Sequence, residues 1–489
     1  MHANPENASN MAQPDKLPLR LKSAYGFGSV AYGVKNSGFD YFLLLFYSQV
    51  IGLDARLVGV AITTALVFDA LSDPIVGYWS DNFRSRWGRR HPFMYCAAAP
   101  VALSYFLLWN PPQEWSQTGL FWYLLVLAVL IRTFITLYET PSSALAPELT
   151  KDYDERSSLI SFRYLFGWCG GNAMTVMMFF LVFPAMATIS IADGRFNRDS
   201  YEVMGIVASG LIFVSIIVSA LGTHSRIGHF VQPPPRTFSA GSVLREIGAT
   251  LANGSFAALF VAALLGAVAT GLAAALSLYF YTYFWEFSSL ETGVILMGIF
   301  LAAIIGFVLA PIVSRTMGKK RGAVVIGLIA FLGAPLPVVL RLVGVLPENG
   351  DPFVFWFVFV AGVIDVGLVI CFQILSSAMM ADLVEQSELK TGRRSEGVLF
   401  STITFIRKSV QGFGLILASF VLHWAAFPAG ASVEQVSDET VWRLGAYYVP
   451  TILALWLSMM AAISAYKLDR GTHEENLKQL AANRSAASS

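Results

Sequence analysis

Two carboxylates lie one helical turn apart within an apolar stretch of the chain. Asp69 and Asp73 fall in the run 67–75, with the hydroxyl of Ser72 beside them. In a helix, residues four apart share a face. Carboxylate and hydroxyl oxygens are hard ligands, which suit Na⁺, Li⁺ or a proton better than a soft metal. The spacing predicts a monovalent cation site, and structural pairing of these acids with Arg or Lys is the alternative.

Further ionisable side chains follow in other apolar stretches. Thr136 and Glu139 share a helical face just ahead of Pro141. Each charge at the bilayer centre costs about 2.5–3.5 kcal/mol on insertion scales, so these groups are expected to face a protein interior or a watery cavity. There Glu139 either contacts solute or cation or forms a structural ion pair, and Lys408 is a candidate counter-charge for the cation site. The other members of this group are Arg132, Arg163 and Asp365.

The elements that must position these residues are membrane-spanning helices. The chain has 489 residues, of which 55% are hydrophobic and only 13% charged. A bilayer core needs about 20 apolar residues per helix, and continuous apolar runs differ from the alternating pattern of a barrel. The sequence therefore predicts an all-α membrane protein with twelve transmembrane helices. They are expected to start near Ala24, Leu57, Phe93, Gly119, Ser161, Val203, Ser255, Thr292, Ala323, Phe353, Val398 and Leu444.

Basic residues in the short loops predict the orientation. Cytoplasmic loops of membrane proteins carry an excess of Lys and Arg. With an even number of spans, both termini then lie in the cytoplasm, and the expected location is a bacterial-type inner (plasma) membrane. The loops that decide this hold Arg84, Arg86, Arg89, Arg90, Arg315, Lys319, Lys320, Arg321, Lys390, Arg393 and Arg394.

A polar, proline-bearing stretch divides the chain. It covers residues 224–254 and is expected to be a cytoplasmic linker. On either side of it we expect six-helix bundles at 24–223 and 255–466, and cytosolic tails at 1–23 and 467–489.

An internal echo supports two parallel halves. A glycine followed by two basic residues occurs after the second span, at Gly88–Arg90, and again after the eighth, at Gly318–Lys320. Such repetition is expected where a transporter is built from two internal repeats. The same loop places Asp81 near Arg89 and Arg90, which suggests a cytoplasmic ion-pair gate that breaks when helices rock apart. The alternative is that these charges only enforce the membrane topology.

Charge and motifs exclude several classes of function. A net charge of +1 leaves no basic field for nucleic acid. The sequence has neither a phosphate-binding loop ending in Lys-Ser/Thr nor a His-Glu-x-x-His motif, so we expect no enzyme and no cofactor. A transporter of an organic solute coupled to a monovalent cation is favoured, and a non-transporting receptor or scaffold in the lipid bilayer is the rival class.

Four stretches carry a resemblance to a known family. The pattern Gly77–Arg90 resembles the cytoplasmic signature of the major facilitator superfamily. The four stretches are similar to one family within it, the glycoside-pentoside-hexuronide:cation symporters, and the resemblance covers nearly the whole chain. The resemblance implies a major facilitator fold of two six-helix halves, a monomer and alternating access. The stretches are Tyr25–Gly28, Asp69–Pro74 with Arg84–Gly88, Tyr138–Pro141, and Ala381–Leu383 leading through Glu396 to Lys408.

The resemblance also implies roles for individual residues. Glu139 falls where the family has a sugar-binding Asp, Arg163 falls on an arginine near the sugar, and Lys408 falls on a lysine that links the solute and cation sites. Ser72 stands where the sugar permeases commonly have Asn. The implied cation ligands are Asp69, Ser72, Asp73 and Thr136.

The pocket departs from the sugar permeases at two positions. Gly33 stands in place of a second sugar-binding Asp, and Ser143 in place of a tryptophan that stacks on sugar. Lys35 and Asn36 are candidate solute-binding replacements, with Asp40 sharing the face of Asn36. The alternatives are a polar cavity lining and, for Asp40, an interfacial position. The solute is therefore expected to be a sugar or glycoside, with a lysophospholipid as the alternative, and the cation is Na⁺ or H⁺.

Overall fold

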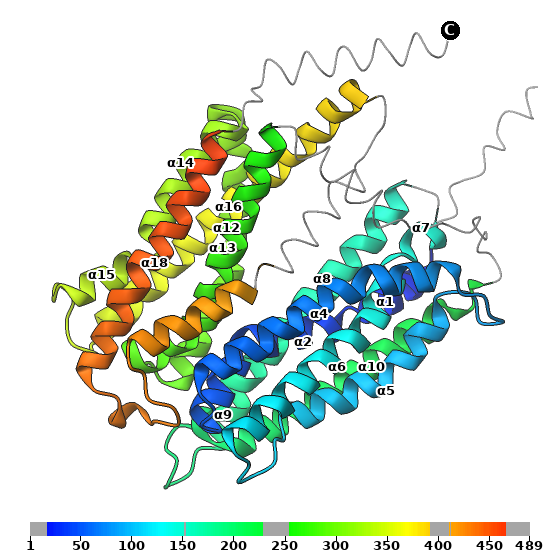
Figure 1. Cartoon of the computed structure of the whole chain (residues 1–489). Helices are drawn as coiled ribbons and strands as arrows, with labels where there is room; N and C mark the ends of the chain where they lie inside the picture. The colour runs from blue at the N-terminus through cyan, green and yellow to red at the C-terminus, as the bar shows by residue number, and fades with distance from the viewer. Residues whose placement is uncertain (1–16, 151–152, 228–253, 392–409, 411, 466–489) are drawn as a thin grey trace, which may run out of the picture.

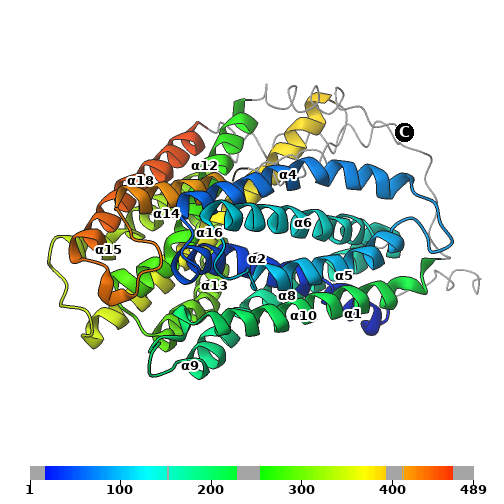
Figure 2. The same cartoon turned by 60° about the horizontal axis from the view of Figure 1, so that its bottom comes forward.

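The computed structural model describes residues 17–150, 153–227, 254–391, 410 and 412–465. All regular structure within these ranges is helical. Figure 1 shows two bundles, one from each half of the chain, which meet at one end and diverge toward the other. The bundles lie side by side in the second view as well (Figure 2).

The first half of the chain forms six spans. Its first span is a bent helix of several segments, and its fifth span ends in a π turn and a short helix. The elements are α1 (Leu19–Phe27), α2 (Val30–Ser37), η2 (Gly38–Phe42), α3 (Leu43–Leu45), η3 (Phe46–Val50), α4 (Ala55–Asn82), α5 (His91–Leu108), α6 (Gln117–Ser143), α7 (Ala146–Leu149), α8 (Tyr153–Met177), η4 (Met178–Val182), α9 (Phe183–Ala185), η5 (Gly194–Phe196) and α10 (Arg198–His224).

The second half repeats this plan. The eleventh span of the chain lies in this half and is described only from residue 410 onward, where a shorter apolar helix covers Gly412–Trp424. The other elements are α12 (Gly254–Tyr279), η7 (Phe280–Phe284), α13 (Ser289–Met317), α14 (Lys319–Gly333), α15 (Leu336–Leu342), α16 (Pro352–Thr391), η8 (Val433–Gln435) and α18 (Asp438–Ser464).

The prediction of an all-α protein with twelve spans is confirmed. Ten helices in the described ranges are long and apolar enough to cross a membrane, and the bent first segment and Gly412–Trp424 complete the twelve. The first helix begins at Leu19, inside the segment 1–23 that the sequence assigned to a tail. Residues 228–253 of the predicted linker, and 466–489, lie outside the described ranges.

The first span is interrupted by π turns. These are η2 and η3, and η2 contains Asp40. A π turn inserts an extra residue and changes the direction of the side chains that follow, and such turns are frequent at functional sites. The bend brings the middle of the first span against both α8 and α12, which places its polar residues between the two halves.

Hydrogen bonds join the halves at the end where they meet. The guanidinium of Arg195 donates to the hydroxyl of Thr282 at 2.9 Å and to the carbonyl of Phe287 at 2.6 Å. The hydroxyls of Ser48 and Tyr279 are hydrogen-bonded across the same seam. Figure 1 shows the helices diverging toward the opposite end, where α1 and α7 lie.

Candidate cation and solute site

Helices α4 and α6 pack together and bring three predicted cation ligands into contact. Asp69 and Asp73 share one face of α4, and Thr136 faces them from α6. The Thr136 hydroxyl oxygen lies 2.9 Å from Oδ1 of Asp69 and 2.9 Å from Oδ1 of Asp73. Asp69 and Thr136 are buried, and Asp73 is half-buried. The three side chains therefore form one oxygen cluster within the first half.

The Thr136 hydroxyl has two carboxylate contacts but only one proton to donate. A threonine hydroxyl carries one proton, so it donates to one carboxylate at a time. The other 2.9 Å contact then places two acceptor oxygens together, unless that carboxyl is protonated or a cation joins the oxygens. The geometry is therefore suited to a proton or to a small hard cation.

Arg132 on α6 pairs with the same cluster. Its Nη1 donates to Oδ2 of Asp69 at 3.1 Å, and both side chains are 8% exposed. The guanidinium also stacks over the ring of Phe39, with 5.0 Å to the ring centroid. A structural pairing of the acids with arginine is the alternative to cation binding, and Asp69 has such a pair in this conformation.

A central cavity of about 210 Å³ lies between the halves beside this cluster. The first half supplies its polar wall, which includes the predicted solute-binding residues Lys35, Asn36 and Glu139. Asp40 also lines this cavity, so its interfacial placement was wrong: the bend in the first span turns it inward. The second half supplies small and apolar residues, namely Gly271, Ala274, Ala275, Gly412 and Leu415.

Two other predicted site residues make contacts elsewhere. Arg163 on α8 donates to the hydroxyl of Ser142 at 3.1 Å and packs against the ring of Tyr25, with 5.5 Å to the centroid. It is not among the residues that line the central cavity. The hydroxyl of Ser72 donates to the backbone carbonyl of Asp69 at 3.0 Å, one turn back along α4.

The two departures from the sugar permeases have a structural basis. Gly33 on α2 packs against the backbone of α8, and a Cβ atom there would lie 1.9 Å from the carbonyl oxygen of Gly167. No side chain fits at this position without separating the helices. Ser143 is exposed at the end of α6 and donates to the carbonyl of Thr140 at 2.8 Å.

At the diverging end, the arginines of the predicted gate contact a residue that the sequence did not single out. The guanidinium groups of Arg89 and Arg90 lie 2.5 Å and 2.6 Å from Oε1 of Glu148 on α7. The sequence signal that could have identified Glu148 is an acidic residue directly after a proline in the short segment that follows the fourth span. The side chain of Asp81 and the whole of Lys408 lie outside what the structure describes.

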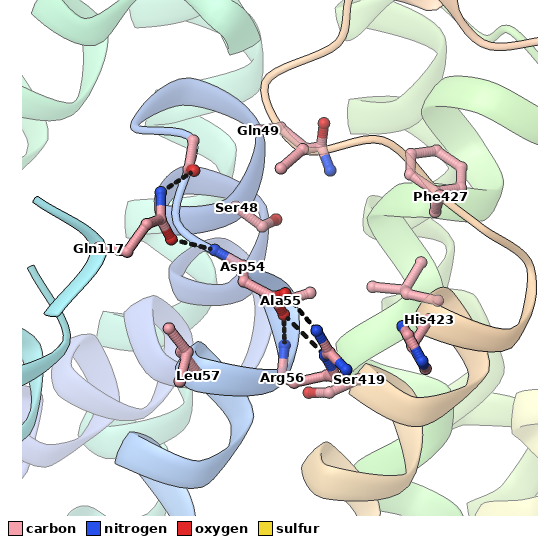
Figure 3. Close-up of a pocket in the computed structure, with 13 residues that line it drawn as sticks. Ser48, Gln49, Asp54, Ala55, Arg56, Leu57, Gln117, Ser419, His423 and Phe427 are labelled. Atoms are coloured by element: carbon pink, nitrogen blue, oxygen red, sulfur yellow. Dashed lines mark hydrogen bonds and ion pairs between the residues drawn. The ribbon is translucent and has the colours of Figure 1, made fainter.

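A second cavity of about 390 Å³ lies at the end where the halves meet. It is lined by the start of α4, the helix Gly412–Trp424 and the loop after it (Figure 3). Its charged residues, Asp54 and Arg56, pair with each other at 2.8 Å. The Arg56 side chain lowers the pKa of the Asp54 carboxyl, chiefly through this hydrogen bond.

Two six-helix halves around a central cavity, with carboxylates buried beside it, define the class of secondary transporters. The sequence model of the family described as "MFS/sugar transport protein" matches residues 24–470. The chain therefore belongs to this family, the glycoside-pentoside-hexuronide:cation symporters of the major facilitator superfamily, as its motifs predicted. It is a multi-pass membrane transporter of the symporter class and not an enzyme.

Known proteins are similar over almost the entire chain. The putative glycoside/cation symporter YagG of Escherichia coli (strain K12) is 26% identical, with 96% of each chain covered. The sodium-dependent lysophosphatidylcholine symporter 1 of Gallus gallus is 24% identical, with 95% of this chain and 90% of the other covered. Among solved structures, a bacterial homologue of the iron transporter ferroportin in an inward-facing state has a TM-score of 0.62 at 13% identity, with 91% and 100% covered.

Proposed function

We propose that the protein couples movement of an organic solute through the central cavity to binding of Na⁺ or H⁺ at Asp69, Asp73 and Thr136. The observation that carries this proposal is the Thr136 hydroxyl, 2.9 Å from a carboxylate oxygen of each aspartate. Two neighbouring acids that share one hydroxyl proton repel each other until a proton or cation joins them. A bound cation is therefore part of the site's stable form.

The central cavity is the proposed solute site. Lys35, Asn36 and Glu139 offer hydrogen-bond donors and acceptors from the first half, while the second half offers small apolar residues. Arg163 does not line the cavity but supports this wall, because it donates a hydrogen bond to Ser142 on α6. Lys408, from the resemblance, remains the proposed link between solute and cation.

Alternating access follows from the arrangement of the halves. They are joined by the Arg195–Thr282 contact and diverge toward the end where α1 and α7 lie (Figure 1). Arg89 and Arg90 pair with Glu148 of α7. The basic loops support a cytoplasmic location for the diverging end and for both termini, and with that orientation this conformation faces inward. Rocking about the central cavity then joins the cytoplasmic ends, where Asp81, Arg89 and Arg90 form the gate. The carrier works as a monomer.

Sugars and glycosides are the first candidate solutes, and lysophospholipids are the second. The relative YagG is named a glycoside/cation symporter, which favours the first. Two observations favour the second: the close packing at Gly33 excludes an acid there, and a chicken relative is named a lysophosphatidylcholine symporter. The small apolar residues of the second half are compatible with an acyl chain or with an apolar aglycone.

Uptake by the purified full chain in proteoliposomes tests the proposal. Sugars, glycosides, glucuronides and lysolipids are each supplied with an imposed Na⁺ gradient, an imposed pH gradient, or neither. Accumulation of one solute class under one gradient is expected, and the responsible gradient identifies the cation. Absence of gradient-driven accumulation across the whole panel, from a folded and thermally stable preparation, rejects symport.

A further inference from the structure

Asp69 binds two different partners through its two oxygens. Oδ1 contacts Thr136 at 2.9 Å and Oδ2 contacts Nη1 of Arg132 at 3.1 Å. We propose that Arg132 is a tethered counter-ion of the cation site, which neutralises Asp69 in the cation-free carrier and is displaced by the incoming cation. This inference rests on the proposed function, and it adds a residue that sets both the affinity and the coupling of that site.

The Arg132–Asp69 pair has the features of a replaceable contact. Arginine–carboxylate pairs are frequently bidentate, with two parallel hydrogen bonds, but here a single Nη1 contact is made. The Nε atom of Arg132 is buried and has no hydrogen-bond partner among the described residues. The guanidinium is therefore held at Asp69 by charge more than by matched geometry.

When a cation displaces Arg132 from Asp69, the arginine charge keeps acidic neighbours. A buried charge that loses its only partner is strongly destabilising, so a replaceable pair needs an alternative site for the released group. Arg132 lines the central cavity together with Asp40 and Glu139, and its guanidinium already packs on the ring of Phe39. The released guanidinium therefore stays within the cavity, near other acids.

Displacement also links the two sites. While Arg132 holds Asp69, its Nη1 is not available to the cavity. When a cation takes its place at Asp69, all the guanidinium donors turn to the space that the solute enters. Cation binding thus changes which hydrogen-bond donors the cavity offers to the solute. Coupling between two sites requires such a difference in contacts between the cation-free and cation-bound states.

Thermal denaturation of the purified full chain tests this inference with Na⁺ as the probe. Wild type and Arg132→Gln are compared in NaCl and in choline chloride of equal ionic strength. In choline chloride the variant is expected to be less stable than wild type, because Asp69 loses its counter-ion. In NaCl it is expected to regain stability, with a Na⁺-dependent shift larger than that of wild type and a half-saturating Na⁺ concentration about tenfold lower, since the competing charge is gone.

Two control variants make the result specific. Lys22→Gln removes another half-buried ion pair of the first half, Lys22–Glu155 at 2.9 Å, and is expected to keep the wild-type Na⁺ shift. In an Asp69→Asn background, adding Arg132→Gln is expected to leave the Na⁺ response unchanged, because the two residues act on one contact.

The inference is overturned if Arg132→Gln gains no more from Na⁺ than wild type does. It is equally overturned if the variant fails to fold in both salts, since Arg132 would then be a fixed structural partner of Asp69. Neither result bears on gradient-driven uptake by the wild-type protein, so failure of this inference is distinguishable from failure of the proposed symport.

Discussion

The Nη1 atom of Arg195 lies 2.9 Å from the hydroxyl oxygen of Thr282, and this contact joins the two halves of the protein. Arg195 is only 2% exposed, and its charge is balanced by Asp193 at 2.5 Å. Its remaining donors reach Thr292 at 3.2 Å and the carbonyl of Phe287 at 2.6 Å. One side chain from the first half thus satisfies three acceptors of the second half and holds this end of the carrier closed.

Arg195→Lys is expected to open the joined end more often, because an ammonium group cannot reach all these acceptors at once. A cysteine introduced at Ser419, which is buried beside the second cavity, reports this opening. Its labelling by a membrane-impermeant maleimide should be about tenfold faster in the variant, which corresponds to about 1.4 kcal/mol. Mass spectrometry of the labelled peptide separates this signal from the native cysteines.

Arg443→Lys is the matched control for this experiment. Arg443 pairs with Glu439 within the second half, and both side chains are well exposed. Exposed pairs of this kind contribute little, so the labelling rate should not change. An unchanged rate in Arg195→Lys as well would show that Arg195 does not hold the halves together.

Asp73→Asn is expected to abolish accumulation of solute against a gradient while leaving some binding or exchange. The amide keeps the shape of the side chain but removes one of the two charges near Thr136, so the cation loses a charged ligand. Uptake and counterflow are measured in parallel in proteoliposomes. Full active accumulation by the variant would contradict the assignment of Asp73 to the cation site.

The helical repeat explains why the grouping of the two carboxylates was predictable from the sequence. Asp69 and Asp73 share a face in any helix, and the cost of charge in lipid requires that face to turn inward. The resemblance then supplied Thr136, whose contact with both acids the structure describes. The number of spans was equally accessible, because each needs about 20 apolar residues.

The contacts between helices were not predictable in the same way. Which residue faces Asp69 across α4 and α6 depends on how the two helices are rotated against each other, and a single sequence does not encode that rotation in any local pattern. The pairing with Arg132 therefore stayed an open alternative. The inward placement of Asp40 depends on a π turn, which no periodicity signalled. Glu148 lies in the short segment after the fourth span, where no spacing pattern singled it out.

The Thr136 hydroxyl is expected to matter more than its methyl group. Thr136→Val removes the hydroxyl oxygen that lies 2.9 Å from both carboxylates. The bound cation then loses an oxygen ligand, so cation affinity should fall by about tenfold. Thr136→Ser keeps the hydroxyl and should remain within about threefold of wild type. The Na⁺ or pH dependence of uptake gives both affinities, and equal effects of the two variants would exclude a role for the hydroxyl oxygen.

Gly33 is expected to tolerate no side chain, because its Cα hydrogen faces the backbone of α8. A Cβ there would lie 1.9 Å from the carbonyl oxygen of Gly167, and backbone cannot move aside as a flexible side chain can. Overpacking of this kind costs about 1–3 kcal/mol or more, so Gly33→Ala should lower the melting temperature. Gly33→Asp, which restores the acid of the sugar permeases, should destabilise further and should not improve sugar uptake.

Gly210→Ala on α10 is the matched control, since a Cβ at this helical glycine meets no atom of the described residues within 4 Å. It should be neutral or slightly stabilising, because alanine favours helix over glycine by about 1 kcal/mol. Melting curves of Gly33→Ala and Gly210→Ala are compared under identical detergent conditions. If the two variants are equally stable, α2 and α8 can separate at Gly33, and the first span then has room for the solute-binding acid that the close packing otherwise excludes.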